Sequence, residues 1–485
     1  MRKWVLRITG VLLVLIIVQT VNTVRYQPDA ANVAQIALPS VDEASLVRHV
    51  TEAVQFKTIS TTGEMGQRGA AFQGFVDWLV QSYPKANAAM TRQMVGGFTP
   101  LYRWQGADAA LAPVLLTAHY DVVPVVNADA WDQAAFSGAV VDGYVWGRGT
   151  LDDKGALVAM MEAVEALAGA GYVPPRTVYF SFGHDEEIGG PQGAGNVAAY
   201  FKEQGIQLAW SLDEGSMVLQ DVIGGLDKPV ASINVAEKGY VNIDITAHAE
   251  GGHSSLPPRT TAVSKLANGL TNLQSGPVPG GLTGVSKDFF DKLGPNFPLV
   301  QRVLFANQWF YRPILEMVLS KSPPTDAMLR STKAPTMLIG SPKENVLPQQ
   351  AMATVNYRIH PRDSIEGLLQ HTKDMVDNDA IEVKLHDAWG AEPSPVSSAD
   401  NAAFIALETT FRQVFGDIIV VPGLTVAATD TRHYGTVADD SYRINPFVFL
   451  DTDIARLHGV NERISVENLV RAVQFYTVLI DNMGK

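Results

Sequence analysis

Short apolar runs alternate with helix-like segments over much of the chain. The runs Pro113–Ala118, Thr177–Phe182 and Leu208–Leu212 are bounded by turn residues, which is typical of buried strands. Lys154–Ala168 has apolar residues at helical spacing and is followed by glycines, and Ser45–Val54 is also a predicted helix. Strands that alternate with helices predict an α/β domain with a mostly parallel sheet.

The pattern changes near Val235. Gly239–His248 and Ala351–Ile359 alternate between apolar and polar residues, as half-exposed strands do. Ser364–Asp377 has helical spacing, and Ile381–His386 again resembles a strand. These elements predict a small α+β domain inserted into the larger one.

Between these elements, residues 276–335 are rich in Pro, Gly and aromatic side chains, and we predict irregular structure there. The α/β pattern returns after about Trp389. The expected organisation is an N-terminal segment at 1–25, a linker at 26–40, a catalytic domain in two parts, and an insert between the parts. The two parts are 41–237 and 389–485, and the insert is 238–388.

The N-terminal segment is typical of an export signal. Arg2, Lys3 and Arg7 precede a weakly polar to apolar run at Ile8–Val18 and a looser apolar stretch to Val24. Because no small-x-small cleavage site is evident, we predict an uncleaved signal-anchor in the membrane, with the catalytic part on the periplasmic or extracellular side. Cleavage would instead give a secreted protein, and a buried N-terminal helix is the alternative to both.

The composition of the chain limits the kinds of binding, catalytic and metal sites that it can have. The chain has 485 residues, no cysteine, and a formal net charge of -13. An acidic chain without a basic footprint is not expected to bind nucleic acid. The absence of cysteine excludes disulfides, thiol nucleophiles and thiolate metal sites, so that any metal is held by His, Asp and Glu.

Acids and histidines follow the predicted strands. His119 and Asp121 come directly after Pro113–Ala118, and a carboxylate beside a metal-binding His commonly orients its ring. Alone, this pair is more often ordinary polar surface. Asp152, just before the predicted helix at 154–168, is either the helix N-cap or a carboxylate that bridges two metal ions.

The run Asp185, Glu186 and Glu187 follows the apolar strand 177–182. Adjacent carboxylates repel each other unless cations are present, so this run favours a functional site over plain surface. One Glu is a candidate metal ligand and the other a candidate general base. Asp213 after the next strand and the distant His458 complete a set of oxygen and nitrogen donors. Such a set suits zinc, with cobalt or manganese as substitutes.

Six motifs occur together in one order: LLTAHYDVVP, WGRGTLDDKG, HDEEIGG, LDEG, GGHSSLPP and HGVNE. As a set they resemble the M20 metallopeptidases, and within these the carboxypeptidase S / PM20D1-like branch. The resemblance covers nearly everything after the N-terminal segment. It implies a dizinc catalytic domain of α/β fold with an inserted α+β lid or dimerisation domain, which is consistent with a homodimer.

The resemblance also implies roles for individual residues. Asp152 bridges two zinc ions, Asp121 is the activating acid behind His119, and Glu186 is the general base. His253 in the insert stabilises the oxyanion, often from the neighbouring subunit. The implied metal ligands are His119, Asp152, Glu187, Asp213 and His458, with Glu214 as an alternative to Asp213. One departure is His184, where relatives carry small residues, and we expect it to pack.

Members of this branch recognise a terminal carboxylate. Arg358 and Arg432 are candidates to bind it, with Asn345 as an amide donor. Structural ion pairs are an equally good interpretation of the two arginines. The aromatic stretch Phe289–Tyr311 is a candidate apolar wall of the site, which would favour long acyl chains over dipeptides.

Three functions follow from these observations. The first is a zinc-dependent exopeptidase of carboxypeptidase type, in which a hydroxide held between the two metal ions attacks the amide bond next to a free C-terminal carboxylate. The second is an N-acyl amino acid hydrolase or synthase, which would use the same catalytic residues. The third, a non-catalytic dimeric binding module, predicts a lost ligand or base, and every implied position retains its residue.

Overall fold

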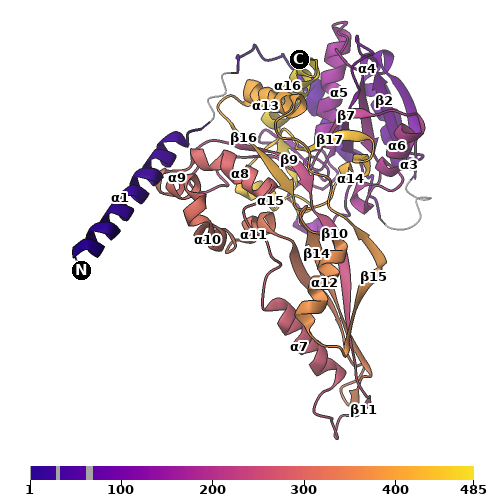
Figure 1. Cartoon of the computed structure of the whole chain (residues 1–485). Coiled ribbons are helices and arrows are strands. Elements are labelled where there is room, and N and C mark those ends of the chain that lie inside the picture. Colours follow the sequence, from indigo (N-terminus) through magenta and orange to yellow (C-terminus); the bar gives the residue numbers. More distant parts are fainter. Residues whose placement is uncertain (1, 29–32, 62–68, 485) are drawn as a thin grey trace.

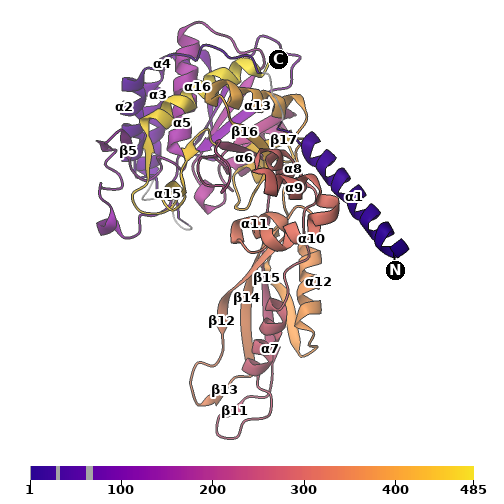
Figure 2. The ribbon, with the colours of Figure 1, turned by 90° about the vertical axis from the view of Figure 1, so that its left-hand side faces the viewer.

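The structure is a computed structural model, and it describes residues 2–28, 33–61 and 69–484. A catalytic domain carries two extensions, a long inserted lid and the N-terminal helix α1 (Arg2–Arg25), which leaves the body on another side (Figures 1 and 2). Part of the predicted linker 26–40, positions 29–32, lies outside the described residues.

The catalytic domain is built on a ten-stranded mixed sheet. Its central strands are parallel: β3 (Val114–His119) lies between β6 (Val178–Gly183) and β7 (Leu208–Asp213), and β17 (Ala438–Arg443) follows β7. One edge is an antiparallel extension of β2 and β1. The remaining strands are β1 (Thr91–Val95), β2 (Thr99–Trp104), β8 (Val218–Leu219), β9 (Val230–Glu237), β16 (Ile419–Thr425) and β18 (Val448–Phe449).

Helices cover both faces of this sheet because side chains along each strand alternate between the faces. On β3, Val114 and Leu116 pack in one cluster and Leu115 in the other. The first cluster holds α2 (Glu43–Gln55), α3 (Gly69–Ser82), α4 (Pro84–Ala89), α5 (Lys154–Gly169), α13 (Ala402–Phe415) and α16 (Val466–Asn482). The second holds α6 (Ala194–Glu203) and α14 (Thr431–Tyr434).

The lid is a four-stranded antiparallel sheet with two helices packed on it. Its order is β12 (Thr332–Ile339), β14 (Gln350–Ile359), β10 (Gly239–His248) and β15 (Ile381–Ala391). The two helices are α7 (Ala262–Gln274) and α12 (Ile365–Val376). At the far tip, β11 (Gly252–His253) pairs with β13 (Val346–Leu347) (Figure 1).

Smaller elements complete the catalytic domain. The strands β4 (Val140–Val141), β5 (Tyr144–Trp146) and β19 (Arg463–Ser465) form a separate antiparallel sheet, and α15 (Asp451–Ile454) precedes the His458 loop. The fold class expected from the sequence is confirmed. The last strand of the lid sheet, β15, ends at Ala391, three residues beyond the expected end of the insert.

The prediction of irregular structure for residues 276–335 was wrong. This segment is mostly helical, and it packs on β9 and β16 at the edge of the main sheet through a small apolar core. The helices are short, and prolines occupy the first turn of one of them, where a missing N–H does no harm. They are α8 (Val285–Leu293), α9 (Leu299–Ala306), α10 (Gln308–Leu319) and α11 (Pro323–Leu329).

Candidate metal centre and active site

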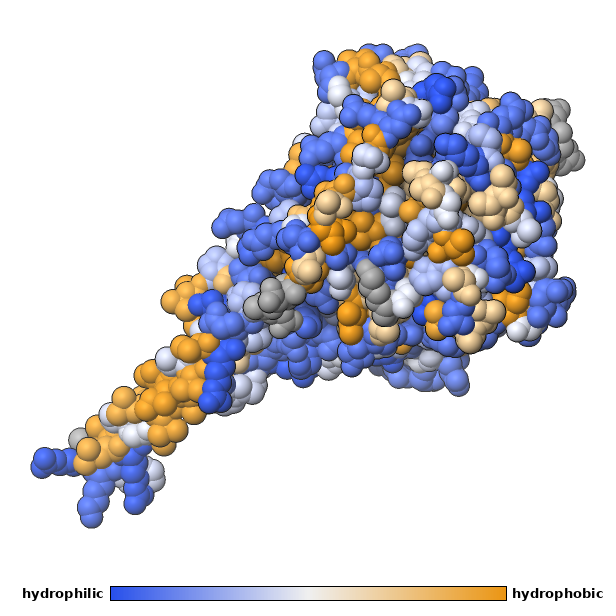
Figure 3. Space-filling model, turned by 90° about the horizontal axis from the view of Figure 1, so that it is seen from above, coloured by the Kyte–Doolittle hydropathy of each residue, from blue (hydrophilic) through white to orange (hydrophobic). Residues whose placement is uncertain are grey.

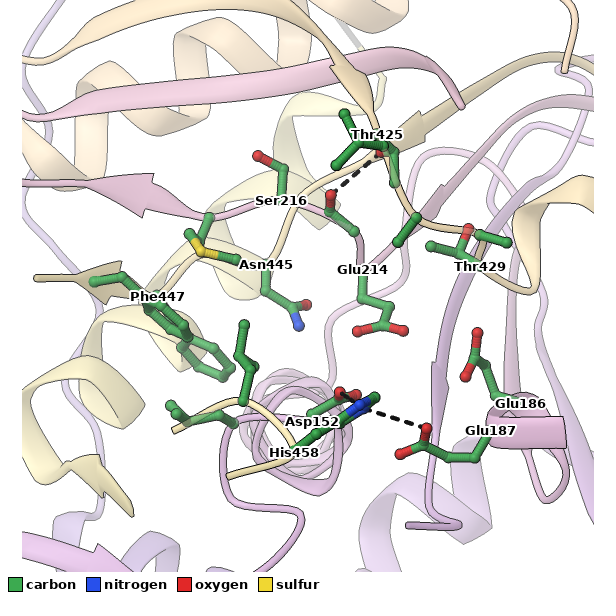
Figure 4. A pocket seen from close by; sticks show the side chains of 18 residues that line it. Asp152, Glu186, Glu187, Glu214, Ser216, Thr425, Thr429, Asn445, Phe447 and His458 are labelled. Carbon is green, nitrogen blue, oxygen red and sulfur yellow. Dashed lines mark hydrogen bonds and ion pairs between the residues drawn. The ribbon is translucent and has the colours of Figure 1, made fainter. Parts of the chain in front are cut away.

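The carboxyl ends of β3, β6 and β7 and two loops of the catalytic domain converge on one pocket. Asp152, Glu186, Glu187, Glu214 and His458 all line it, and Figure 4 shows their side chains directed into a common space. Ligands collect at the carboxyl ends of strands in α/β sheets because the loops that follow parallel strands gather at that edge.

His119 begins the first group of donors. Its Nε2 lies 2.9 Å from Asp152 Oδ1 and 3.4 Å from Glu214 Oε1. His119 ends β3, so its side chain is held within the sheet and is almost fully buried. Three ligand atoms from these residues lie within 4.8 Å of one another, which is close enough to hold one metal ion.

His458 completes a second group on the other side of Asp152. His458 Nε2 lies 3.0 Å from Asp152 Oδ2 and 3.3 Å from Glu187 Oε2. Asp152 therefore belongs to both groups, and it offers a different carboxylate oxygen to each. A carboxylate that offers its two oxygens to two groups of donors could contribute to two ion sites.

Asp121 lies behind His119 and holds the acid run in place. Its Oδ1 is 3.4 Å from His119 Nδ1 and accepts a hydrogen bond from the main-chain N–H of Glu186 at 3.1 Å. Its Oδ2 accepts hydrogen bonds from Glu187 N at 3.1 Å and Ser60 Oγ at 2.5 Å. One fully buried carboxylate thus links the metal-site histidine to the backbone that carries Glu186 and Glu187.

The electrostatics of the pocket reflect an excess of buried negative charge. Burial and the neighbouring Asp152 raise the pKa of Glu214 to about 8. Hydrogen bonds to Asp152 and Glu187 raise the pKa of His458 to about 10. For His119, burial opposes the charged form, but contacts with Asp121, Asp152 and Glu214 outweigh it and raise the pKa well above its usual value. Divalent cations would replace these protons and balance the carboxylates.

Glu186 lies in the same pocket (Figure 4), and its side chain is partly buried. Burial raises the pKa of its carboxyl group well above the usual value, and the charges of Glu214 and Asp430 act in the same direction. A carboxylate with a raised pKa accepts and returns a proton near neutral pH, which is the property required of a general base.

The structure places Glu214, and not Asp213, beside His119 and Asp152. Asp213 ends β7 with its carboxylate turned toward α14, where Oδ2 accepts hydrogen bonds from Thr431 N at 2.9 Å and Thr431 Oγ1 at 2.6 Å. Its Oδ1 accepts a hydrogen bond from Glu214 N at 2.9 Å. Asp213 therefore fixes the backbone that presents Glu214, and the expectation that Asp213 itself is a ligand does not fit this geometry.

A buried ion pair positions the loop of His458. Arg148 Nη1 lies 2.5 Å from Glu462 Oε2, and Arg148 Nη2 donates hydrogen bonds to the main-chain oxygens of His458 and Gly459 at 3.0 and 2.9 Å. Glu462 Oε1 accepts hydrogen bonds from Gly149 N and Leu151 N, both at 2.9 Å. Neither Arg148 nor Glu462 was predicted to have a role, although both lie inside the quoted motifs.

His184 packs, as expected. Its Nδ1 lies 2.7 Å from Thr99 Oγ1, and its ring makes edge contacts with Phe72 and Phe98. The neighbouring Asp185 is structural as well, because its carboxylate accepts hydrogen bonds from Gln192 N and Gly193 N at 2.7 and 2.8 Å. Only Glu186 and Glu187 of the acid run line the pocket.

His253 and Asn345 lie together, but away from the metal-ligand groups. His253 is on β11 at the tip of the lid, and Ser254 N donates a hydrogen bond to the main-chain oxygen of Asn345 at 3.2 Å. The tip projects away from the catalytic domain (Figures 1 and 2), and His253 is exposed. Within one chain, neither residue lines the pocket that holds Glu186.

The two candidate arginines occupy different places. Arg358 lies on β14 near the base of the lid, with its guanidinium 4.9 Å from the centre of the Tyr240 ring. Arg432 lies on α14 and donates a hydrogen bond to the main-chain oxygen of Gly189, two residues after Glu187. Both are half-buried. Arg432 is thus tied to the loop that carries Glu186, whereas Arg358 belongs to the lid.

The wall of the pocket is largely apolar, but it does not come from the predicted stretch Phe289–Tyr311. That stretch is absent from the described lining of the pocket, and Phe289, Phe290 and Phe305 pack in a separate core. The apolar lining comes instead from Leu151, Met217, Val426, Phe447, Phe449 and Leu457.

Comparisons with known proteins agree with the family that the motifs indicate. The family model described as peptidase family M20/M25/M40 matches residues 115–482. A probable carboxypeptidase S-like protein 2 of Dictyostelium discoideum is 37% identical, over 98% of this chain and 92% of its own. The N-fatty-acyl-amino acid synthase/hydrolase PM20D1 of Xenopus tropicalis is 36% identical, over 92% of this chain and 87% of its own.

Solved structures show the same fold. Human carnosine dipeptidase 1 superposes with a TM-score of 0.62 at 16% identity, over 91% of this chain and 96% of that one. The M20 metallo-carboxypeptidase Sso-CP2 of Sulfolobus solfataricus gives a TM-score of 0.62 at 18% identity, over 91% and 99%. Because the family model covers well over half of the chain, the chain belongs to peptidase family M20/M25/M40 and is a metallopeptidase or amidohydrolase.

Proposed function

We propose that this protein hydrolyses the amide bond next to a free carboxylate with the help of two divalent ions, zinc being the first choice and cobalt or manganese substitutes. The observation that carries the proposal is the position of Asp152, whose two oxygens face two separate groups of donors. One group is His119, Asp152 and Glu214, and the other is Asp152, Glu187 and His458. The donors are nitrogen and oxygen only, which suits these metals.

When bound, such a pair of ions lowers the pKa of water and polarises a carbonyl group. The protein's own residues supply the rest of the chemistry. Glu186 takes a proton from the attacking water and returns it to the departing amine, and its raised pKa suits both steps. Asp121 contacts both the ring of His119 and the backbone N–H of Glu186, and thereby fixes their relative positions for this transfer.

We propose that the lid tip of a second copy completes the site. His253 and Asn345 are adjacent to each other but do not line the pocket of their own chain. In a homodimer, His253 would donate a hydrogen bond to the developing oxyanion and Asn345 would contact the substrate. Arg358 and Arg432 are the proposed partners of the substrate carboxylate, since guanidinium groups bind carboxylates in a bidentate manner.

The second candidate substrate is an N-acyl amino acid, which the enzyme would hydrolyse or form by the reverse reaction. The apolar lining of the pocket supports it, because a fatty acyl chain gains more from such a wall than a small peptide does. A relative named N-fatty-acyl-amino acid synthase/hydrolase is 36% identical to this chain.

One panel of substrates tests both candidates. Metal-loaded protein is assayed against a blocked dipeptide and an N-fatty-acyl amino acid, each with a free carboxylate and as the matched C-terminal amide. We expect cleavage of at least one free acid and a loss of at least about 100-fold for its amide, because an arginine then lacks its charged partner. Equal rates for acids and amides would exclude carboxylate recognition.

For the N-terminal helix we propose a signal-anchor role, with the catalytic part outside the cytoplasm. α1 is long and apolar enough to cross a membrane by length and composition, and no part of its apolar window is buried inside the protein. Its positive charges, Arg2, Lys3 and Arg7, precede the apolar run, as the positive-inside rule requires of a cytoplasmic N-terminus.

A further inference from the structure

One face of helix α10 is apolar and open to solvent. Trp309, Phe310, Ile314, Met317 and Val318 have between 48% and 61% of their surface exposed. At 3.6 residues per turn, positions 310, 314, 317 and 318 fall within an arc of about 100°, so these four side chains share one side of the helix and Trp309 lies at the edge of this face. Water-exposed helix faces are normally polar, so a contiguous apolar face of this size marks a surface that contacts something else.

The opposite face of α10 fixes the orientation of the helix. Leu315 is buried in the same apolar core as Phe290 and Phe305. At the polar edge, Glu316 pairs with Arg312 at 2.7 Å and accepts a hydrogen bond from Leu282 N at 2.8 Å. Rotation of α10 to hide the apolar face would break these contacts, so the exposed side chains are held outward by the fold.

Helix α10 is joined to the last turns of α1. Tyr311 Oη donates a hydrogen bond to Gln19 Oε1 at 3.1 Å, and Asn22 Nδ2 donates one to Asn307 Oδ1 at 3.0 Å. Asn307 Nδ2 in turn donates to Thr23 Oγ1 at 3.3 Å. Polar contacts of this kind set the angle at which α1 leaves the body.

Exposed apolar side chains also occur on α9 and α1, the helices next to α10. Leu299 and Val300 on α9 are also strongly exposed, and α9 contacts α1. Both ribbon views place α9 and α10 beside the C-terminal end of α1 (Figures 1 and 2), and the surface of α1 is apolar along most of its length (Figure 3).

We propose that the α9–α10 surface, comprising Leu299, Val300, Trp309, Phe310, Ile314, Met317 and Val318, lies in the interfacial layer of the lipid bilayer that contains α1. The proposal rests on the anchor role of α1. A bilayer fits this surface better than a second protein copy does, because the surface lies beside the end of the apolar helix that we propose enters the membrane. An exposed Trp beside an aliphatic face is typical of helices that lie at a membrane surface.

The absence of cysteine makes a direct test possible. Single cysteines are introduced by Ile314→Cys and Met317→Cys in the full chain and carry a nitroxide spin label. Ile405→Cys is the matched control, because Ile405 is 52% exposed and lies on α13, outside the α9–α10 surface. The protein is reconstituted into vesicles of phosphatidylcholine and phosphatidylglycerol, and accessibility to oxygen and to a water-soluble nickel chelate is compared at each label.

We expect the labels at 314 and 317 to be more accessible to oxygen than to nickel, as in the interfacial layer, and the label at 405 to be accessible to nickel. Aqueous accessibility at 314 and 317 in floating vesicles would overturn the proposal, as would strong spin–spin coupling between copies in place of a lipid signal. Protein that fails to float with the vesicles would contradict the anchor role of α1, and with it this inference, while leaving the proposed hydrolase untouched.

A second variant tests contact with lipid by placing a positive charge on the α9–α10 surface. For protein in vesicles that carries the nitroxide label on Val318→Cys, we expect the added change Ile314→Arg to raise the accessibility of the label to the nickel chelate. Hydrolysis of a small soluble substrate should remain unchanged, since Ile314 is outside the pocket. A label at 318 that does not respond to this charge would count against contact with lipid.

Discussion

At the scale of single residues, function depends on which oxygen of each carboxylate faces which partner. Asp152 presents one oxygen to His119 and the other to His458. Asp121 uses both of its oxygens to hold the backbone of the two glutamates that follow β6. These orientations distinguish the carboxylates that we propose as metal ligands from those that hold the loops in place.

Replacement of the proposed base separates the effect of lost proton transfer from the effect of lost metal. Glu186→Gln is expected to lower kcat by about 100-fold or more while two ions per chain remain bound, because proton transfer of this kind contributes factors of that order. The measurement combines steady-state kinetics with elemental analysis, and Glu203→Gln on the exposed end of α6 serves as the control. Full activity of the Glu186→Gln variant would show that another group moves the proton.

Asp213 and Glu214 are adjacent in sequence but are expected to respond differently. Glu214→Ala removes a donor from the group of His119 and Asp152, so metal content should fall from two ions per chain to one. Asp213→Asn should keep both ions but lower Tm, because the hydrogen bonds of Asp213 hold Thr431 and the backbone of Glu214. The opposite pattern of metal loss would restore Asp213 as the ligand.

The sequence points to the two acids after β7 but does not decide which of them faces His119. In a strand, neighbouring side chains point to opposite faces, so only one of Asp213 and Glu214 can reach the site. The choice depends on Thr431, which follows in sequence more than 200 residues later and takes the carboxylate of Asp213. No local pattern contains that partner.

At the scale of elements, loops from distant parts of the chain must meet with fixed geometry. The Arg148–Glu462 pair joins the loop before α5 to the loop after α15, and thereby brings His458 to Asp152. Both side chains are almost fully buried, so each depends on the other for compensation of its charge.

Glu462→Gln tests this connection. The change leaves Arg148 buried without its anionic partner, which typically costs about 3–5 kcal/mol. We expect a lower midpoint of denaturation and weaker zinc binding, since the loop that presents His458 loosens. Asp417→Asn, which breaks the exposed Lys228–Asp417 pair, is the control and should cost less than about 1 kcal/mol. Equal effects of the two changes would mean that the buried pair does not hold the site.

The elements that the sequence predicted well are those with continuous apolar runs. β3, β6 and β7 are buried along nearly their whole length, so their composition reports their environment directly. Residues 276–335 were not predicted because their helices are short, interrupted by proline, and stabilised by packing on β9 and β16. Such packing is tertiary information and overrides weak local propensity.

At the scale of the whole molecule, the lid separates two parts of the proposed chemistry. The metal-ligand groups lie in the catalytic domain, whereas His253 and Asn345 lie at the far tip of the lid (Figure 1). Sequence motifs identify such residues by resemblance, but only the three-dimensional arrangement shows that one chain does not bring them together.

Complementation between inactive variants tests the second copy. His253→Ala and Glu186→Gln should each be inactive alone, but mixed chains that exchange subunits should regain activity. One site of each hybrid dimer then has Glu186 in its own chain and His253 from the other. We expect recovery of up to about one half of the wild-type rate in hybrid dimers under the proposed arrangement. No recovery despite demonstrated subunit exchange would show that His253 does not act in the site of the other subunit.

Metal dependence is the most direct test of the proposed dinuclear hydrolase. Protein stripped of metal with a chelator is titrated with zinc while binding is followed by calorimetry and amide hydrolysis is assayed at each step. The geometry around Asp152 predicts two bound ions per chain and activity that appears only as they bind. Full hydrolytic activity in protein shown to be free of metal would contradict it.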